Sequence, residues 1–307
     1  MKRNTLFALS VLGLLAGCGD QTLVAGLFIN TPAITVTLPA EAFDGGSVQP
    51  TPITLGPYTA LLGYLTSIDT SDITNFSSAA ITPITGATVT LAYESCVNVI
   101  DTLDGGTAHE SCVATATGGT DRELSIPESG GGLYELLSTN DGTLTFEQGV
   151  TYTMILQVPD GDSTDAYGAS FQPGPPAHMV EFADKATPLT VDAGTSLVVH
   201  RDDAMVNGEY LPAALVVGQI DPNNPSSTPS IVWSSLNYSD PKTLALFALS
   251  DIPYRVPSFT IDSSAFMTSG YYVVVMVSIT EGKASDNAFI GSTALAGSGD
   301  IGAVIVQ

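Results

Sequence analysis

Alternation of apolar and polar residues is the dominant pattern along this chain. From Ile34 to Leu38, apolar residues alternate with threonines, which is typical of a strand with one buried face. The same pattern predicts further strands, separated by short stretches rich in Gly, Pro, Asn and Asp that favour turns. These predicted strands cover 88–93, 133–137, 143–146, 152–158, 196–200, 213–220, 231–236, 255–261, 271–279 and 303–307.

Two segments depart from simple alternation. The run from Tyr271 to Val277 is unbroken and rich in β-branched residues, which predicts a central strand that is covered on both faces. The run 243–249 fits a strand or a helix equally well, because Asp240 and Pro241 could serve as the N-cap and the first residue of a helix. Both interpretations of 243–249 remain open at this point.

The composition supports an all-β fold. The chain has 30 glycines, 19 prolines and only 13% charged residues, whereas long helices usually need many Glu, Lys and Arg on their wet faces. Hydrophobic residues make up 44% of the chain, which is enough to bury a core. The proline-rich segment 173–177 cannot continue a strand, so we predict that it links two β-sandwich domains at 31–172 and 178–307.

The first twenty residues have the pattern of a targeting leader. Two basic residues, Lys2 and Arg3, precede an apolar run at 5–15, which is too short to span a bilayer because a spanning helix needs about 20 residues. The leader ends in Leu15-Ala16-Gly17-Cys18, and this sequence resembles the lipobox of bacterial lipoproteins.

The lipobox resemblance has four consequences. It implies a signal peptide at 1–17, lipidation of Cys18 and a lipidated tether at 18–30. It also implies the outer membrane of the cell envelope, because the residue after the cysteine is Gly19 and not the aspartate that retains such proteins in the inner membrane. The membrane is then a partner through the lipid anchor alone.

The net charge limits the other partners. The formal charge of the full chain is −23, from 8 basic and 31 acidic residues. Removal of the leader takes away Lys2 and Arg3, so the mature chain would have 6 basic residues and a formal charge of −25. A field of this sign repels nucleic acids and anionic lipid head groups, so both are excluded as partners of the folded surface.

Two cysteines remain besides Cys18. Cys96 and Cys112 form an even pair in a chain that the leader sends to an oxidising compartment, and we therefore expect a disulfide between them. A redox or zinc site is the alternative. Their spacing disfavours it, because it is not C-x-x-C and no matching set of His and Cys accompanies them.

The second predicted domain resembles an immunoglobulin-like sandwich in two places. Trp233 lies within a predicted strand, like the core tryptophan of that fold, and the turn at Ala265-Phe266 leads through Gly270 into a strand, like the corner before its penultimate strand. The resemblance implies two tandem immunoglobulin-like β-sandwiches, although the cysteine pair of antibody domains is absent from 178–307. The first domain contains Ile84-Thr85-Gly86-Ala87-Thr88-Val89 and Gly149-Val150-Thr151-Tyr152, and with these segments it resembles the repeat-sandwich modules of cell-envelope lipoproteins.

Three aspartates form the one candidate metal site. Asp160, Asp162 and Asp165 lie close together in a predicted turn, and calcium prefers several carboxylate oxygens. The pattern of a helix–loop–helix calcium site is absent, because Thr164 and Asp165 occupy its fifth and sixth positions. A charged, solvated turn is therefore the alternative, and no other cofactor is predicted.

No complete catalytic set is present. Gly297 to Gly302 matches G-x-G-x-x-G, but the chain ends five residues later, so we interpret it as a loop before the last strand. Gly161-Asp162-Ser163 resembles the nucleophile block of one esterase family but has no D-x-x-H partner. The segment His200-Arg201-Asp202-Asp203 is interpreted as a polar turn and not as half of a metal site.

The sequence thus favours a non-catalytic envelope lipoprotein whose β-sandwich domains bind a protein, a glycan or another envelope component. A secreted hydrolase or an accessory domain of an envelope enzyme is the alternative, with chemistry assembled from residues distant in sequence. A purely structural spacer is the third possibility.

Overall fold

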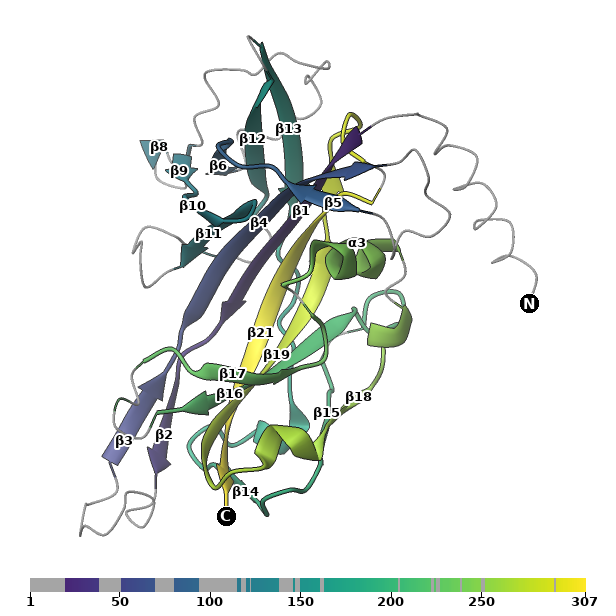
Figure 1. The fold of residues 1–307 in the computed structure, drawn as a ribbon. Coiled ribbons are helices and arrows are strands. Elements are labelled where there is room, and N and C mark those ends of the chain that lie inside the picture. The colour runs from purple at the N-terminus through teal and green to yellow at the C-terminus, as the bar shows by residue number, and fades with distance from the viewer. Residues whose placement is uncertain are drawn as a thin grey trace.

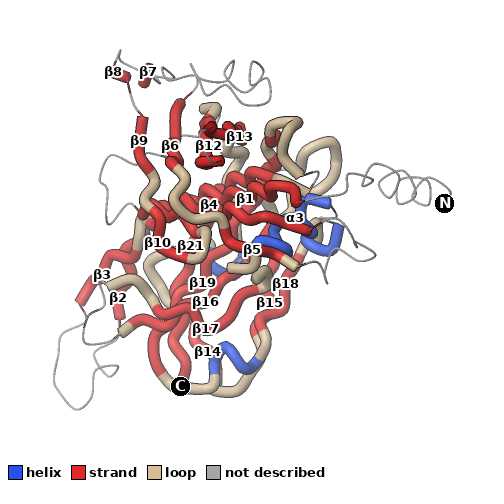
Figure 2. The backbone as a smooth tube through the Cα atoms, turned by 45° about the horizontal axis from the view of Figure 1, so that its top comes forward, coloured by secondary structure: helices blue, strands red, loops and turns tan. Residues whose placement is uncertain are grey.

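A computed structural model describes residues 20–38, 51–69, 80–93, 115–116, 120–121, 123–137, 146, 150–160, 163–203, 205–221, 224, 227–237, 239–249, 252–289 and 291–307. This described part consists mainly of strands, with short helical segments beside them (Figure 2). The predicted all-β class is therefore confirmed.

The strands have the following bounds, in chain order. They are β1 (Asp20–Thr31), β2 (Ile34–Leu38), β3 (Thr51–Leu55), β4 (Tyr58–Asp69), β5 (Ile81–Pro83), β6 (Thr88–Tyr93), β7 (Thr115–Ala116), β8 (Thr120–Asp121), β9 (Glu123–Ser125), β10 (Glu128–Gly130), β11 (Leu133–Leu137), β12 (Tyr152–Asp160), β13 (Ser163–Phe171), β14 (Leu189–Val191), β15 (Leu197–His200), β16 (Ala213–Ile220), β17 (Ser230–Ser234), β18 (Ser258–Ile261), β19 (Gly270–Glu281), β20 (Lys283–Ala284) and β21 (Thr293–Val306). The helical segments are α3 (Pro241–Leu249) and the 3₁₀ turns η4 (Val180–Phe182), η5 (Ile252–Tyr254) and η6 (Ser263–Phe266).

One ten-stranded sheet, here called the main sheet, runs through the molecule. Its order is β10-β11-β4-β1-β21-β19-β16-β17, with β5 beside β4 and β14 beside β21. Neighbouring strands are antiparallel except that β21 runs parallel to both β1 and β14. Figure 1 shows β4, β1, β21 and β19 side by side in the centre. We call the half of this sheet near Asp20 proximal and the half near Val306 distal.

The main sheet crosses the predicted domain boundary at 173–177. Strands β1, β4 and β11 come before that segment and β16, β17, β19 and β21 come after it, yet all belong to one sheet. Tandem sandwiches would each close their own sheets. The expected arrangement of two immunoglobulin-like sandwiches is therefore not confirmed.

The predicted tether at 18–30 is wrong from Asp20 onward. That residue begins β1, a twelve-residue strand that lies between β4 and β21 in the main sheet. Leu23, Val24 and Phe28 are fully buried there. Both faces of this strand are covered, so its apolar residues do not alternate with polar ones as those of a half-buried strand do.

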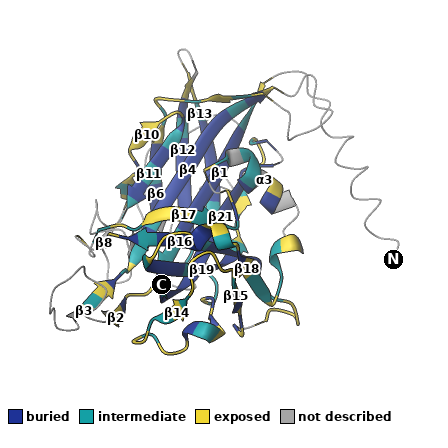
Figure 3. Ribbon diagram, turned by 60° about the horizontal axis from the view of Figure 1, so that its bottom comes forward, coloured by how far each residue is buried: buried dark blue, intermediate teal, exposed yellow. Residues whose placement is uncertain are grey.

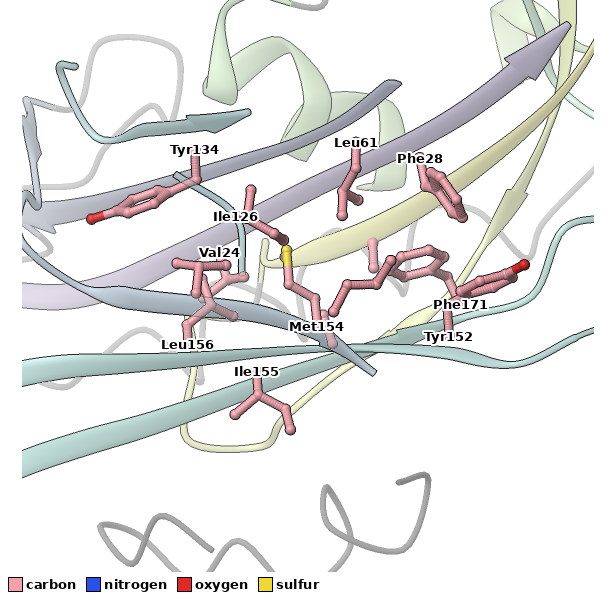
Figure 4. Packing of buried hydrophobic residues seen from close by; sticks show 14 of the residues in the cluster. Val24, Phe28, Leu61, Ile126, Tyr134, Tyr152, Met154, Ile155, Leu156 and Phe171 are labelled. Carbon is pink, nitrogen blue, oxygen red and sulfur yellow. The ribbon is translucent and has the colours of Figure 1, made fainter. Parts of the chain in front are cut away.

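A second sheet covers the proximal half of one face of the main sheet. Its order is β20-β13-β12-β6-β9. Phe28 of β1 meets Tyr152 and Phe171 edge to face, with ring centroids 4.9 and 5.7 Å apart, as Figure 4 shows. Met154 points from β12 toward Gly63 in β4, where a Cβ atom would lie 3.3 Å from its sulfur. The glycine leaves the room that the methionine fills.

Three smaller layers complete the core. On the same face as the second sheet, the β15–β18 pair with η4 and η6 covers the distal half over Tyr272, Val274 and Met276. On the other face, α3 covers the proximal half, and the β2–β3 hairpin covers the distal half. Figure 3 shows the main strands dark blue between these layers. This burial on both faces of β19 confirms the predicted central strand at 271–277.

The ambiguous run 243–249 belongs to a helix. In α3 the carboxylate of Asp240 accepts hydrogen bonds from the Lys242 backbone N–H and the Thr243 hydroxyl, each at 3.0 Å. Pro241 is the first helical residue, where its missing N–H costs nothing. Local capping therefore decides between the two interpretations.

The Gly297–Gly302 motif is not a loop, which corrects the sequence-based interpretation. It lies inside β21, between β1 and β19. A Cβ atom at Gly299 would be 2.9 Å from the Asn30 carbonyl oxygen, and one at Gly302 would overlap the Phe182 ring. These glycines allow close approach of neighbouring chain segments, which is a known use of glycine inside strands.

Two immunoglobulin-like cues have different outcomes. Trp233 is half-buried on β17, at the end of the main sheet, and its indole N–H donates to Asp262 at 3.2 Å, so it is not a central core residue. The corner before β19 is present: the Tyr272 hydroxyl donates to the Thr268 carbonyl at 2.6 Å, which is the hydrogen bond of a tyrosine corner. Burial raises the pKa of Tyr272 above its usual 10.0, which keeps this donor protonated.

Candidate functional site

Four of the predicted site residues lie outside the described residues. They are Cys18, Cys96, Cys112 and Asp162. Lipidation of Cys18 and the disulfide between Cys96 and Cys112 therefore stay predictions.

The calcium hypothesis concerns the β12–β13 hairpin. Asp160 is the last residue of β12 and pairs with Ser163, whereas Asp165 lies in β13 opposite Val158. Among the described residues, no group of three or more His, Cys, Asp or Glu is placed to hold a metal ion. Calcium binding at Asp160, Asp162 and Asp165 therefore stays a prediction, with the charged turn as its alternative.

The predicted linker lies against the main sheet. The Thr280 hydroxyl donates to the Gln172 carbonyl at 2.6 Å, the Ser298 hydroxyl donates to the Gly174 carbonyl at 2.7 Å, and the Ala177 N–H donates to the Ser298 carbonyl at 3.0 Å. These bonds join the predicted linker to β19 and to Ser298, the last residue of β21 that pairs with β1. We call residues 172–203, which continue from here across the distal half, the crossing segment.

A buried carboxylate fixes this crossing segment. Asp300 of β21 is only 5% exposed. Its oxygens accept hydrogen bonds from the Met179 N–H at 2.8 Å and from the Lys185 ammonium group at 2.7 and 2.8 Å. Removing a charge from water is costly, and these charge-assisted bonds offset that cost.

A second buried ion pair lies beside it. The Arg201 guanidinium donates to both carboxylate oxygens of Asp203, through Nε at 2.6 Å and through Nη2. It also donates to the Ser278 hydroxyl at 3.0 Å and to the Leu211 carbonyl at 2.8 Å. The polar-turn interpretation of residues 200–203 is therefore wrong for Arg201 and Asp203. Both are buried, and the ion pair between them offsets the cost of removing their charges from water.

The outer side of the crossing segment carries two histidine–carboxylate pairs. An antiparallel bridge joins Met179 to Arg201, and both of these side chains are buried. Their neighbours in sequence are exposed, because side chains alternate between the two faces of a strand. We call these exposed residues the outer platform: His178, Val180, Val198, His200 and Asp202.

Both pairs on the outer platform bond to Nδ1 of the imidazole. Asp202 contacts Nδ1 of His178, and Glu181 bonds to Nδ1 of His200 at 2.6 Å while it also accepts the His200 backbone N–H at 2.8 Å. An ionised carboxylate can only accept, so the proton of each neutral ring is on Nδ1. Nε2 is then left as the acceptor of each half-exposed ring, where it can bind a donor group of a partner.

A serine lies next to one of these rings. Ser258 is directly opposite His200 in the β15–β18 pair. Side chains of directly opposed residues share a face, with Cβ atoms about 5 Å apart. An acid, a base and a hydroxyl therefore lie on neighbouring segments, and the hydrogen bond between Glu181 and His200 is one of the two that a hydrolytic triad requires.

Exposed apolar side chains gather on the same part of the chain. Every large hydrophobic side chain that is exposed among the described residues lies between Val180 and Met267. Val180 and Val198 of the outer platform are 45% and 43% exposed, and Ile231 on β17 is 55% exposed. Figure 3 shows β17 largely in yellow on the surface. Exposed apolar side chains favour contact with another molecule where they lie together, and Val180 and Val198 are the two that belong to the outer platform.

The sequence interpretation missed the outer platform. The residues from Val198 to Asp203 alternate between exposed and buried in the structure, but two valines followed by four polar residues show no such alternation in the sequence. In the parts of the chain described, no helix is long and apolar enough to cross a bilayer. No family model matches the sequence, and no curated protein is similar to it.

Proposed function

We propose that this chain is a non-catalytic lipoprotein of the outer membrane, anchored through Cys18, whose outer platform binds a protein, a glycan or another component of the cell envelope. The observation that carries the binding role is the outer platform itself, where two exposed valines lie beside two imidazole rings with free Nε2 atoms. Apolar contacts and oriented hydrogen bonds are what a binding surface needs.

The membrane anchor is tested by replacing the lipidated residue. We expect Cys18→Ser to move the protein from the membrane fraction to the soluble fraction, because the acidic surface has no attraction of its own for anionic lipid. Gly17→Ala is the matched control, since it keeps a small residue before the cysteine. Membrane association that is unchanged in Cys18→Ser would contradict the anchor.

The binding role is tested by photo-crosslinking on intact cells. A crosslinker at Val198 should give a discrete adduct, and Val180→Asp should abolish it because a charge replaces an exposed apolar contact on the outer platform. The same crosslinker at Glu123, which is exposed on β9, is the control. Equal labelling at both positions would contradict a specific surface and would favour the structural spacer.

A hydrolase is the second candidate, and the Glu181–His200–Ser258 arrangement favours it. In that case the Ser258 hydroxyl would attack an ester carbonyl, Nε2 of His200 would take the hydroxyl proton and return it to the leaving alcohol, and water would then release the acid. A fluorophosphonate probe distinguishes the two functions. Labelling that is lost in Ser258→Ala would support hydrolysis, whereas an unlabelled protein would leave the binding role.

A further inference from the structure

The start of β1 lies two residues after the predicted lipidation site. β1 begins at Asp20, so only Gly19 separates it from Cys18. An extended chain covers at most about 3.6 Å per residue, which places Asp20 within about 7 Å of Cys18. A long tether would let the folded part move away from the bilayer, whereas this short spacing keeps the start of β1 close to the lipidated residue.

The first residues of β1 cannot supply extra length. β1 pairs with β4 along all of its residues, from Asp20 opposite Asp69 to Thr31 opposite Tyr58. The Phe289 N–H donates to the Thr22 carbonyl at 2.8 Å, and the Val24 N–H donates to the Ser292 hydroxyl at 3.0 Å. Detaching this end would break the ladder and expose Leu23 and Val24, which are fully buried.

We propose that the proximal end of the molecule rests directly on zwitterionic lipid head groups. This inference rests on the proposed lipidation of Cys18 and adds an orientation to it. Asp69 lies opposite Asp20, and the Ala80 carbonyl accepts the Asp69 N–H at 3.4 Å, so these three residues are at the same level of the main sheet. Figure 1 shows this end at the upper right, where β1, β4 and β5 meet.

The charge at this end selects the kind of head group. Asp20 and Asp69 are both exposed and lie opposite each other, so the end repels anionic lipid. The lipid anchor, and not electrostatic attraction, imposes the contact. Zwitterionic head groups have no net charge and therefore accept this end without repulsion.

The same orientation places the outer platform far from the bilayer. Asn30, opposite Ser298, lies ten residues along β1 from Asp20, which corresponds to about 33 Å at 3.3 Å per residue. Asp300, which holds the crossing segment under the outer platform, is two residues beyond Ser298. A partner in the surrounding fluid can therefore reach the outer platform.

The native tryptophan provides the distal probe for the test. Trp233 pairs with Val217, Val217 with Val274, and Val274 with Gly302. Gly302 is nine residues beyond Thr293, or about 30 Å further along β21. Ala80→Trp in a Trp233→Phe background provides the proximal probe, because Ala80 is exposed.

The experiment measures tryptophan quenching in the lipidated full-length protein, reconstituted in phosphatidylcholine vesicles that carry a nitroxide on the head group. We expect about a twofold loss of emission for Ala80→Trp and little change for native Trp233. Their separation along the sheet is about 46 Å, because Ala25, which pairs with Thr293, is itself five residues beyond Asp20. Twelve Gly and Ser residues inserted after Gly19 should abolish the quenching, because they add about 20 Å of flexible chain. Flotation with the vesicles verifies anchoring in each case.

The outcomes separate the two proposals. A protein that floats with the vesicles but shows no quenching of Ala80→Trp would overturn the orientation and leave the anchor intact. Equal quenching of both probes would also overturn the orientation. A protein that never carries lipid would contradict the proposed function, which the Cys18→Ser fractionation tests independently.

Discussion

At the scale of single residues, the carboxylate of Asp300 binds the crossing segment to the main sheet. Its bonds to Met179 and Lys185 join residues more than a hundred positions apart. Asp300→Ala would leave the Met179 N–H unpaired in a buried place and would remove the partner of Lys185, whose side chain is 30% exposed, so we expect the free energy of unfolding to fall by about 3 kcal/mol. Asp202→Ala is the matched control on the exposed pair with His178, and we expect a loss of about 0–1 kcal/mol there.

Urea denaturation of both variants checks this prediction. A similar small loss for Asp300→Ala and Asp202→Ala would show that the buried carboxylate does not hold the crossing segment. The burial of Asp300 and Arg201 could not be predicted from the sequence, because charged residues are exposed by default. Asp300 pairs with Lys185, 115 residues away, and Arg201 bonds to Ser278, 77 residues away, in addition to its ion pair with the nearby Asp203.

At the scale of elements, the alternation of apolar and polar residues predicted strands with one buried face. Turn-forming residues marked the ends of other strands. The predicted 213–220 matches β16, and 88–93 matches β6. β4 was missed, because both of its faces are covered by other layers and its apolar residues do not alternate. The first half of β21 was missed for a different reason: its glycines are typical of a loop, and only distant segments show why they are needed.

Gly302 allows η4 to pack on β21, and this contact can be tested. A side chain at position 302 would overlap the Phe182 ring, so we expect Gly302→Ala to lower the free energy of unfolding by about 3 kcal/mol. In a Phe182→Ala background the same change should cost much less, because the ring is absent. Thermal unfolding of the two single variants and the double variant gives the coupling. Additive losses would contradict the proposed contact.

At the scale of the whole molecule, the parallel pairing of β1 with β21 decides the architecture. Ala25 to Asn30 pair with Thr293 to Ser298, so the first described strand and the last one are neighbours. A pairing across some 270 residues leaves no local signal, whereas the proline-rich segment 173–177 gives a strong one. The sequence therefore predicts a domain boundary at 173–177. In the structure this segment lies against the main sheet, to which strands from both sides of it belong.

The shared sheet makes the two halves of the chain depend on each other. Separating 20–172 from 173–307 would leave β1 and β21 as open edges and would uncover Phe28 on one side and Ala296 on the other, both now fully buried. We expect neither fragment to unfold cooperatively in urea when it is produced alone, and co-expression of the two to restore one cooperative transition. If fragment 173–307 unfolds cooperatively by itself, with the midpoint of the full chain, then the pairing of β1 with β21 contributes nothing to stability. The second half would in that case be an independent domain, as the linker signal predicts.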